Sequence, residues 1–400
     1  MAGLLVARQP IFDQELQLSG YELLYRGPGQ DGSPEEWGNR ATSEVLVSLL
    51  TGEELERLVG GHPVYVNLTQ EFLLDLPSLP LVPERMVLEV LEDVVVDPSL
   101  LASVQELARQ GHTIALDDFV LQPENRKLLE MADLVKVDVQ AHGWEQLAEV
   151  ASSLRQYGAR LVAEKVETHA EFTFCRYLGF DLFQGFFFAH PREVSCRPLS
   201  GSSLQLVNLL GRLHDPALTL EELIGLVEQD VSLSYRLLRL INSSYFPIHR
   251  EVDSVARAVA YLGLNPVRTW VTWLAMARVE DKPQELMITS LVRARMAAAL
   301  GQNMGNRPRD GYFTAGLFSS LDALVDRPMA EVVASLPISE DLSAALLRRD
   351  GPLGEVLGVV LRFERGEWEV KDALPLDSEE VGASYREAVA WVEELREALV

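Results

Sequence analysis

The sequence predicts an α/β barrel of the TIM-like kind over its first half, followed by an all-α domain. Short apolar runs alternate with amphipathic segments up to about residue 190, and from about residue 197 the apolar spacing is helical. The chain has 400 residues with 48% hydrophobic content, which is more than one ordinary core holds. We therefore expect one domain over residues 1–196 and a second over residues 197–400.

Eight short runs in the first half are rich in strand-forming residues. The first two, LLVARQPIF and LQLSGYELLYR, are separated only by DQE, which favours an antiparallel hairpin. The others are VYVNL, MVLEVLE, TIALDD, LVKVDV, RLVAEKV and LFQGFFFA, with helical segments such as EQLAEVASSLRQYGA between them. Apolar strands that alternate with helices favour a parallel sheet covered by helices, so we expect a barrel with one antiparallel strand.

The second half almost lacks such runs. Its segments, such as SSLQLVNLLGRLHD, TLEELIGLVEQ and SLSYRLLRLINSS, place apolar residues at helical spacing. The segment HPREVSCRPLSGSS, with two prolines and four serines, separates the two textures. The dipeptide His214-Asp215 precedes Pro216 and indicates a helix boundary rather than a metal site.

Charge and cysteine content exclude several classes of protein. With 35 Lys and Arg against 60 Asp and Glu, the net charge is −25, so we expect no nucleic-acid polymer as a partner. Cys175 and Cys196 cannot build a disulfide framework, which favours a reducing cytoplasm. No window is long and apolar enough for a membrane span, so we also expect no membrane partner and a cytoplasmic location.

Polar side chains interrupt the strands from the second onward, at about the same level of each strand. Taken alone, each one would be read as a strand end or a helix cap. In a barrel, however, the carboxyl ends of the strands converge on one mouth, so these side chains are expected to meet. They are Glu22, Asn67, Glu89, Asp117, Asp118, Lys136, Glu164 and Gln184.

The five carboxylates of this group point to a metal site. Gathering them in one place costs many kcal/mol of desolvation and repulsion unless cations neutralise them. All-oxygen ligation favours Mg²⁺ or Mn²⁺ over zinc. Two such ions could clamp a phosphodiester and activate water, with Lys136 orienting or deprotonating that water or balancing the phosphoryl charge.

Seven strings in order, YELLYR, VYVNLT, LEVLED, LDDF, LVKVD, AEKVET and GFDLFQGFFFAHP, resemble the motifs of the EAL domain. This domain is the cyclic di-GMP phosphodiesterase of bacterial signalling, and the resemblance covers about residues 1–195. It implies that cyclic di-GMP is the ligand and that Glu22, Lys136 and Glu164 are catalytic. It further implies that Arg26 contacts a ligand phosphate, that Gln184 and Glu167 are outer members of the site, and that the metal ligands are Glu22, Asn67, Glu89, Asp117, Asp118 and Glu164.

One departure from the family follows Asp118. There the family usually has a glycine-containing loop that helps to place the second metal and links the site to dimerisation, whereas this chain has VLQPENRKLL. Pro123 restricts φ where glycine would allow a tight turn, so we expect Asp118 to be presented differently. Glu92, which resembles the glutamate that anchors this loop, is retained.

A milder departure is Lys165, where the family commonly has glycine. Strand alternation predicts that its side chain faces away from Glu164.

The run from LIGLVEQDVSLSYRLLRL to LGLNPVRTW resembles the HDOD domain, a helical relative of HD phosphohydrolases that acts as a signalling or partner-binding module. The resemblance is strongest over about residues 200–275. Where a catalytic HD domain has its His-Asp metal pair, this chain reads GLFSS, with Ser319 and Ser320. The resemblance therefore implies a non-catalytic helical domain that binds an unknown protein partner.

Two functions from different classes stay open at this point. One is a metal-dependent cyclic di-GMP phosphodiesterase, and the other is a non-enzymatic cyclic di-GMP receptor or a protein-interaction scaffold. The set of metal ligands favours the enzyme, and the altered loop favours the receptor or scaffold. The oligomeric state is open as well, with a homodimer among the arrangements that the resemblance allows.

Overall fold

The structure is a computed structural model that describes residues 5–26, 53–75, 85–92, 94–117, 125–190, 201–215, 217–243, 246, 252–279, 282–303, 309–368 and 374–399. The chain forms two compact units. The first is Met1–Phe187 with Phe363–Trp368, and the second is Phe188–Arg362 with Glu369–Val400. The predicted boundary between residues 196 and 197 lies outside the described residues and stays a prediction.

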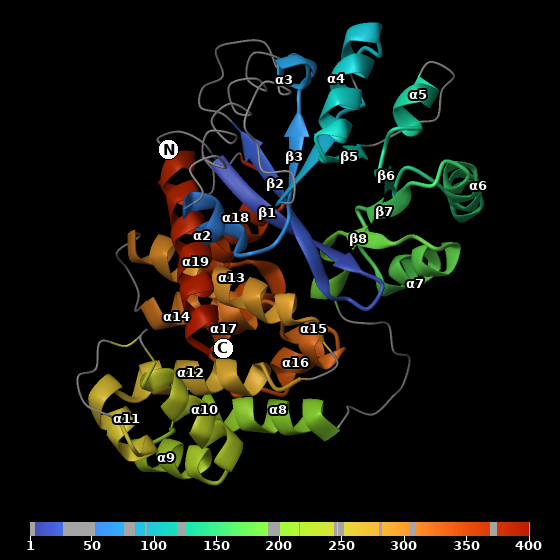
Figure 1. The fold of residues 1–400 in the computed structure, drawn as a ribbon. Helices are drawn as coiled ribbons and strands as arrows, with labels where there is room; N and C mark the ends of the chain where they lie inside the picture. The colour runs from blue at the N-terminus through green and yellow to red at the C-terminus, as the bar shows by residue number, and fades with distance from the viewer. Residues whose placement is uncertain are drawn as a thin grey trace. The chain divides into compact units, whose positions relative to one another are not determined.

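The first unit is a closed barrel of eight strands in sequence order (Figure 1). β1 is antiparallel to both of its neighbours, β2 and β8, and every other pair of neighbouring strands is parallel. The prediction of a barrel with one antiparallel strand is confirmed. The strands are β1 (Leu5–Asp13), β2 (Leu18–Arg26), β3 (Val64–Leu68), β4 (Met86–Val90), β5 (Thr113–Leu116), β6 (Leu134–Asp138), β7 (Arg160–Glu164) and β8 (Leu182–Gln184).

A tight turn joins β1 to β2. The carboxylate of Asp13 accepts hydrogen bonds from the backbone N–H groups of Glu15 and Gln17, at 2.9 and 2.8 Å. Leu16 adopts a left-handed φ of 61°, which lets the chain reverse within a few residues. The connection, residues 14–17, is short, and it forms the antiparallel hairpin that the sequence predicts.

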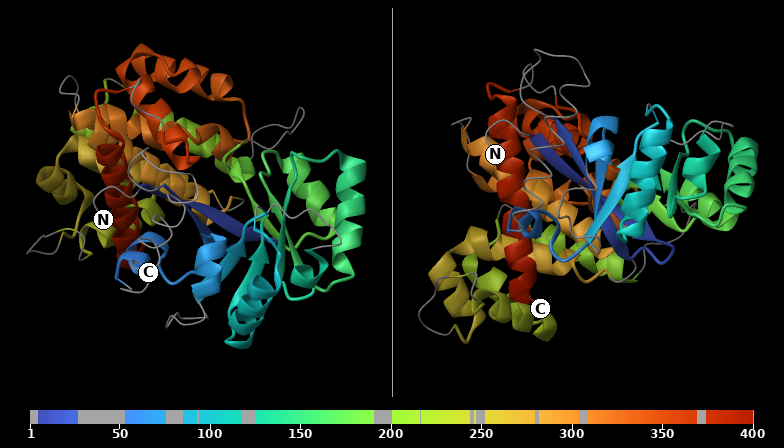
Figure 2. Two further views of the ribbon diagram at one scale, coloured as in Figure 1. Left: turned by 90° about the horizontal axis from the view of Figure 1, so that it is seen from above. Right: turned by 45° about the horizontal axis from the view of Figure 1, so that its top comes forward.

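Helices cover the outside of the barrel, as Figures 1 and 2 show for α4, α6 and α7. Asp97 caps the N-terminus of α4, and Thr168 and Glu171 form a reciprocal capping box at α7. Gly179 ends α7 with a φ of 82°, a conformation that glycine adopts without steric cost. The helices of this part are α2 (Glu53–Val59), α3 (Gln70–Asp75), α4 (Pro98–Arg109), α5 (Arg126–Leu129), α6 (Trp144–Arg155) and α7 (His169–Leu178), and a 3₁₀ helix, Phe186–Ala189, follows β8.

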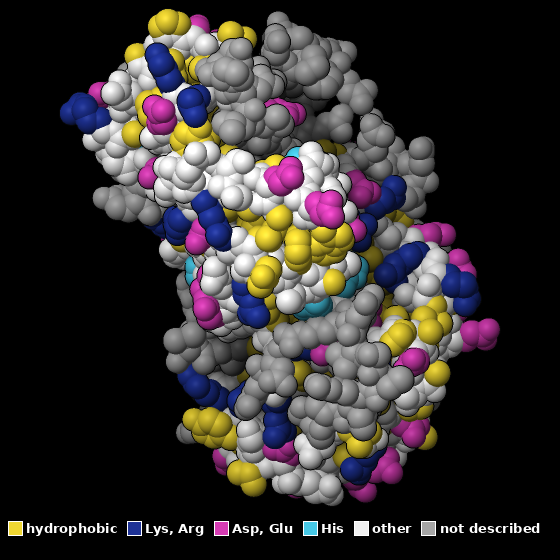
Figure 3. All heavy atoms as spheres, turned by 90° about the vertical axis from the view of Figure 1, so that its right-hand side faces the viewer, with side chains coloured by type: hydrophobic (Ala, Val, Ile, Leu, Met, Phe, Trp, Pro, Cys, Tyr) yellow, Lys and Arg dark blue, Asp and Glu magenta, His cyan; other side chains and the backbone are white. Residues whose placement is uncertain are grey.

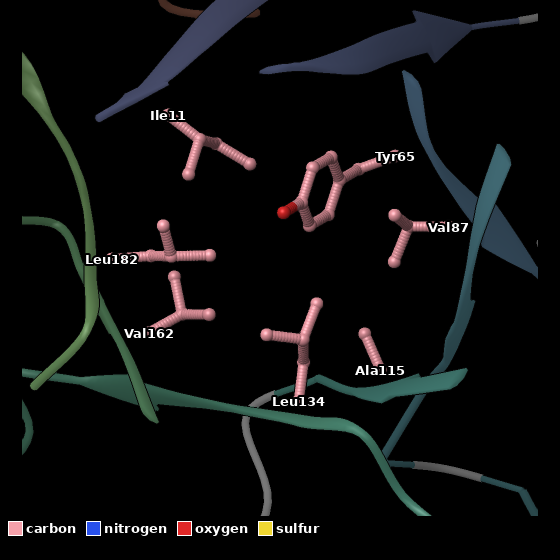
Figure 4. Close-up of a cluster of buried hydrophobic side chains, with 7 residues drawn as sticks. All are labelled: Ile11, Tyr65, Val87, Ala115, Leu134, Val162 and Leu182. Carbon is pink, nitrogen blue, oxygen red and sulfur yellow. The ribbon is translucent and has the colours of Figure 1, made fainter. Parts of the chain in front are cut away.

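A layer of seven side chains fills the barrel interior. One side chain comes from each strand except β2, and all seven point toward one another (Figure 4). Since alternate residues of a strand face the same side, the next inward-facing residue on each parallel strand lies two positions further along the chain. The layer consists of Ile11, Tyr65, Val87, Ala115, Leu134, Val162 and Leu182.

The described residues after position 200 form helices joined by short connections, as predicted. α8 ends at Leu213, and the next residue, His214, hydrogen-bonds through Nε2 to Thr272 Oγ1 at 3.0 Å. The prediction of a helix boundary there is confirmed. The helices are α8 (Gly201–Leu213), α9 (Leu220–Glu228), α10 (Val231–Ile241), α11 (Val255–Leu262), α12 (Leu264–Met276), α13 (Gln284–Asn303), α14 (Arg309–Phe318), α15 (Leu321–Val325), α16 (Met329–Ala334), α17 (Glu340–Arg348), α18 (Gly351–Glu364) and α19 (Ser378–Leu399).

Helices α13 and α14 pack unusually close to each other. A Cβ atom at Gly316 would lie 2.5 Å from both Ala294 Cα and Arg293 O, which are backbone atoms of α13. A Cβ atom at Gly301 would lie 2.3 Å from the ring of Tyr312. Glycine at these two positions is therefore what allows the two helices to approach.

The surface carries both signs of charge despite the net charge of −25. On the face shown in Figure 3, acidic and basic side chains are interspersed with hydrophobic ones. Within the described residues, none of the helices combines the length and the apolar character that a membrane crossing requires.

Candidate functional site

Directly beyond the apolar layer lies a layer of polar side chains, two residues further along the strands. Tyr65 and Val87 in β3 and β4 are followed at this spacing by Asn67 and Glu89, whose Cα atoms are paired in the sheet. The same step of two residues leads from Ala115 to Asp117, from Leu134 to Lys136, from Val162 to Glu164 and from Leu182 to Gln184. The barrel therefore presents the predicted polar residues at one level, as their positions in the strands indicated.

Lys136 is the centre of this layer. Its side chain is 1% exposed, and its ammonium group forms ion pairs with four carboxylates that come from different parts of the barrel. The distances from Lys136 Nζ are 2.7 Å to Glu164 Oε1, 2.8 Å to Glu89 Oε1, 2.9 Å to Asp117 Oδ1 and 3.3 Å to Glu22 Oε2. If all four carboxylates were ionised, the group would carry a charge of −3, from four negative charges and one positive charge.

Amide side chains hold Glu22 in place. Asn67 Nδ2 donates to Glu22 Oε1 at 2.8 Å, and Gln184 Nε2 donates to Glu22 Oε2 at 2.6 Å. Gln184 Nε2 also donates to Gln9 Oε1 at 2.9 Å. Each oxygen of the Glu22 carboxylate thus accepts at least one hydrogen bond from an amide, which fixes its orientation toward Lys136.

Gln9 is a member of the site that the sequence analysis missed. It lies in β1, opposite Glu22 of β2 in the strand register. Because β1 runs antiparallel to the other strands, the inward-facing residue at the level of the site lies two positions before Ile11 of the apolar layer, not after it. A glutamine in a mostly apolar strand was the signal that the sequence offered.

The pKa values of the site carboxylates diverge. Burial raises the pKa of Glu164 to about 8 and raises the pKa of Glu89 well above its usual range, although Lys136 opposes both shifts. Burial acts in the same direction on Glu22, but the charge of Lys136 and the amide hydrogen bonds outweigh it, so the pKa of Glu22 is lowered. Glu22 is therefore ionised near neutral pH, while Glu89 and Glu164 favour their protonated forms.

Burial alone would lower the pKa of Lys136, but the surrounding carboxylates, Glu22 foremost, raise it well above its usual value. The lysine is therefore an ammonium ion in this arrangement.

The donor set fits a hard divalent cation. Among the described residues, no three His, Cys, Asp or Glu side chains are already arranged around a common metal position, because the carboxylates close on Lys136 Nζ instead. The ammonium group thus occupies the position of a cation within an all-oxygen shell. Three buried acceptor atoms of the layer, Glu89 Oε2, Asn67 Oδ1 and Gln184 Oε1, have no hydrogen-bond partner among the described residues. Buried acceptors in this state are suited to a cation or to its bound water.

Four predicted residues are not brought into this cluster by any described contact. Glu167 has an exposed side chain, and its backbone N–H donates to Glu171 Oε2 at 2.8 Å at the start of α7. Glu92 is exposed as well. Asp118, the loop that follows it to residue 124, and the side chain of Arg26 lie outside the described residues.

Lys165 follows Glu164 and points away from the site, as predicted. Its side chain is 55% exposed and forms an ion pair with Asp138, with 2.6 Å between Nζ and Oδ2. Its backbone has a left-handed φ of 53°, which explains in physical terms why glycine suits this position. The substitution therefore changes the outer surface of β7 and leaves the inward direction of Glu164 intact.

The helical unit has a buried polar cluster at Ser319 and Ser320. Ser290 Oγ and Ser320 Oγ are hydrogen-bonded to each other, and Arg293 Nη1 donates to Ser319 Oγ at 3.3 Å. Arg293 is only 5% exposed. A buried guanidinium group at this place opposes the binding of a second cation by repulsion.

Comparisons with known proteins place two domain families on the chain. A model of the EAL domain matches residues 66–191, and a model of the HDOD domain matches residues 203–332. Two relatives match almost the full length. The uncharacterized protein YuxH of Bacillus subtilis is 31% identical over 98% of this chain and 99% of its own length. Cyclic di-GMP phosphodiesterase CdgJ of Vibrio cholerae is 32% identical over 98% of this chain and 92% of its own length.

Among solved structures, the manganese and cyclic di-GMP complex of BlrP1 from Klebsiella pneumoniae is 27% identical. It covers 46% of this chain and 55% of its own chain, with a TM-score of 0.36.

Proposed function

Because the chain belongs to the family of proteins that join an EAL domain to an HDOD domain, we propose that it is a bacterial cyclic di-GMP phosphodiesterase. The barrel binds a divalent metal and cyclic di-GMP and hydrolyses the nucleotide to its linear form. The helical domain carries no hydrolytic site and binds a protein partner. Its relative CdgJ, which matches 98% of this chain over 92% of its own length, is a cyclic di-GMP phosphodiesterase by name.

The observation that carries this proposal is the convergence of four carboxylates on one position at the barrel mouth. Such an arrangement lowers the free energy of unfolding, because the carboxylates lose their hydration and repel one another. It is useful for the binding of a cation that in turn binds a phosphate group. Glu22, Glu89, Asp117 and Glu164, together with the oxygen of Asn67, would hold the metal, and Mg²⁺ or Mn²⁺ fits an all-oxygen set.

A bound divalent metal supplies positive charge that polarises the phosphodiester and acidifies a bound water. The residues of the chain provide the rest. Gln9, Gln184 and Asn67 fix the orientation of Glu22 through their amide contacts. Lys136, held as an ammonium ion, can donate hydrogen bonds to a water or a phosphate oxygen and balance the negative charge of the transition state, but it cannot take a proton. Arg26 would contact a ligand phosphate, and Asp118 would hold a second metal.

A non-enzymatic receptor or scaffold is the second candidate, and the sequence VLQPEN after Asp118 and Phe119 favours it. If this segment misplaces Asp118, one metal and the nucleotide would bind while turnover stays slow. The loss of one metal clamp weakens the transition state more than the ground state. On the scale of one preorganised electrostatic contact, about 3–4 kcal/mol, the rate would fall by roughly two to three orders of magnitude.

The deciding experiment incubates the purified full chain with cyclic di-GMP and Mn²⁺ or Mg²⁺ and follows the linear dinucleotide by chromatography. The enzyme forms product that depends on the metal and that disappears in the Glu22→Gln variant. Binding of cyclic di-GMP without product over several hours would instead establish the receptor. In that case, replacing VLQPEN with a glycine-containing loop should restore turnover at nearly constant affinity.

A further inference from the structure

The helical unit contains a pocket that the proposed function does not use. It has a volume of about 760 Å³ and lies among α8, α9, α10 and the end of α12. These helices pack against one another in the second unit, as Figure 1 shows. A volume of this size lies within the range of roughly 300–1,000 Å³ that small-molecule sites occupy.

The walls of the pocket combine a buried apolar part with charged side chains. Leu206, Leu226 and Leu233 line it and are between 0 and 6% exposed. Three arginines line it as well: Arg212 of α8, Arg236 of α10 and Arg278 after α12. In a chain with a net charge of −25, three guanidinium groups in one pocket form a local positive region.

One acidic residue, Asp230, also lines the pocket and is already engaged. It caps α10 by accepting from the backbone N–H of Leu233 at 3.0 Å, and it forms an ion pair with Arg278. The ion pair holds Arg278 in place and cancels one charge. The lining therefore keeps a charge of +2, from three arginines and one aspartate.

Arg212 and Arg236 have exposed side chains, and neither forms a hydrogen bond or ion pair with another described residue. Arg212 lies near enough to Glu222 to contribute to the lowered pKa of that carboxyl group, but Glu222 interacts mainly with Thr219 and does not line the pocket. Within the part of the chain that the structure describes, the hydrogen-bonding capacity of both guanidinium groups is not taken up by another side chain.

We propose that this pocket binds a small organic phosphate, a ligand that combines a dianionic phosphate group with an apolar part. The phosphate matches the charge of +2, and its oxygens match the planar fork of an arginine. The apolar part would lie against Leu206 and Leu226, which keep a small accessible area at the wall of the pocket. The helical domain would then be a ligand-responsive module in its own right.

The test is calorimetric titration of the full chain with phenyl phosphate, in the presence of EDTA so that the barrel holds no divalent metal. Inorganic phosphate and benzyl alcohol, which represent the two halves of the probe, are titrated separately. Phenyl phosphate should bind saturably and more tightly than either half, and its affinity should fall as NaCl is added.

Two double variants with the same change in net charge distinguish the contacts within the pocket from the effect of the protein's overall charge on ligand binding. Arg212→Gln/Arg236→Gln should weaken binding roughly tenfold or more, the scale of lost hydrogen bonds to a charged group. Arg239→Gln/Arg257→Gln changes two arginines that do not line the pocket and should leave the affinity nearly unchanged.

Three outcomes would overturn the proposal: no saturable binding, equal weakening by both double variants, or equal affinity for benzyl alcohol. An acidic peptide is titrated in the same way, and tighter binding of this peptide than of phenyl phosphate would also overturn the proposal, because the pocket would then suit a protein partner. Because all three proteins, the wild type and the two double variants, are measured without metal, none of these results depends on activity of the barrel.

Discussion

Glu89 is the least exposed carboxylate of the barrel site, at 0%, and its raised pKa shows that its ionised form is disfavoured without a cation. Metal binding should therefore stabilise the barrel through that charge. With metal at about a hundred times its Kd, the gain is about 2.7 kcal/mol, or roughly 5–10 °C for a domain of this size.

We expect the Glu89→Gln variant to lose this metal-induced rise in unfolding temperature. Without metal, its unfolding temperature should at least equal that of the wild type, because the neutral amide replaces a carboxyl group whose ionised form is disfavoured by burial. Glu149→Gln, which changes an exposed glutamate of α6, is the control and should keep the full metal response. Thermal unfolding with Mn²⁺ or EDTA measures both, and an undiminished response in Glu89→Gln would refute the assignment of Glu89 as a metal ligand.

The raised pKa values also predict how stability depends on pH. Unfolded glutamates titrate near 4.5, whereas Glu164 in the folded barrel titrates at about 8 and Glu89 is raised as well. Between these values the folded state binds more protons than the unfolded state, so the free energy of unfolding decreases as pH rises. The slope is about 1.4 kcal/mol per pH unit for each such proton.

In EDTA, the barrel should therefore become less stable as pH rises from 5 to 8. The lowered pKa of Glu22 acts only below about pH 4.5, and the raised pKa of Lys136 acts only above about pH 10.5, so neither alters this window. Protons compete with metal for the carboxylates, so stabilisation by Mg²⁺ should be larger at pH 8 than at pH 6. Denaturant titrations at both pH values test the sign, and greater stability at pH 8 in EDTA would contradict it.

The sequence predicted most of the site at this scale, because a charged residue in an apolar strand is conspicuous. Glu22, Asn67, Glu89, Asp117, Lys136 and Glu164 all lie in the layer that strand alternation predicts. Gln9 was missed because β1 runs antiparallel to the other strands. In β1 the residue at the level of the site therefore lies two positions before the residue of the apolar layer, not two positions after it. The central position of Lys136 could not be predicted from the sequence either, because the distances between side chains of different strands depend on how the barrel closes.

At the scale of elements, the close contact of α13 with α14 predicts how an alanine at position 316 changes stability. Gly316→Ala places a methyl group against the backbone of α13, which cannot move aside as a flexible side chain could. Overpacking of this kind typically costs about 1–3 kcal/mol. We expect a clear fall in the unfolding temperature of the helical unit, measured by calorimetry.

Gly358→Ala in α18 is the matched control, because a Cβ atom there meets nothing within 4 Å. Alanine in an open helix interior should be neutral or stabilising by up to about 1 kcal/mol. If both alanine variants change the unfolding temperature equally, then helix propensity and not the close contact of α13 with α14 determines the effect of Gly316→Ala.

Helix α13 is an element whose orientation and neighbours the sequence pattern does not predict. Residues 285–294 are all buried, so this helix has no polar face from which its orientation could be predicted. It packs against α14, which is the next helix along the chain, and also against α19, which is the last helix. The spacing of apolar residues predicted a helix in the second half, but the choice of its neighbours depends on surfaces that form only in the folded unit.

At the scale of the whole molecule, the two units have separate cores, and the proposed metal site belongs to one of them. Calorimetry of the full chain should therefore resolve two transitions, of which Mn²⁺ raises only one. The Glu89→Gln variant should keep both transitions and lose the shift. A single transition that moves as a whole with metal would show that the units unfold together.

The antiparallel first strand has a consequence for how the molecule is made. β1 pairs with β8 through Ile11 and Gln184, which are 173 positions apart (184 minus 11), so the ring cannot close until the ribosome has released the eighth strand. Until then, the early hairpin has an unpaired edge, a state that favours association with chaperones or with other nascent chains. The bonds of Gln184 to Gln9 and Glu22 lie on this last seam, so the proposed metal site is completed only when the seam is made.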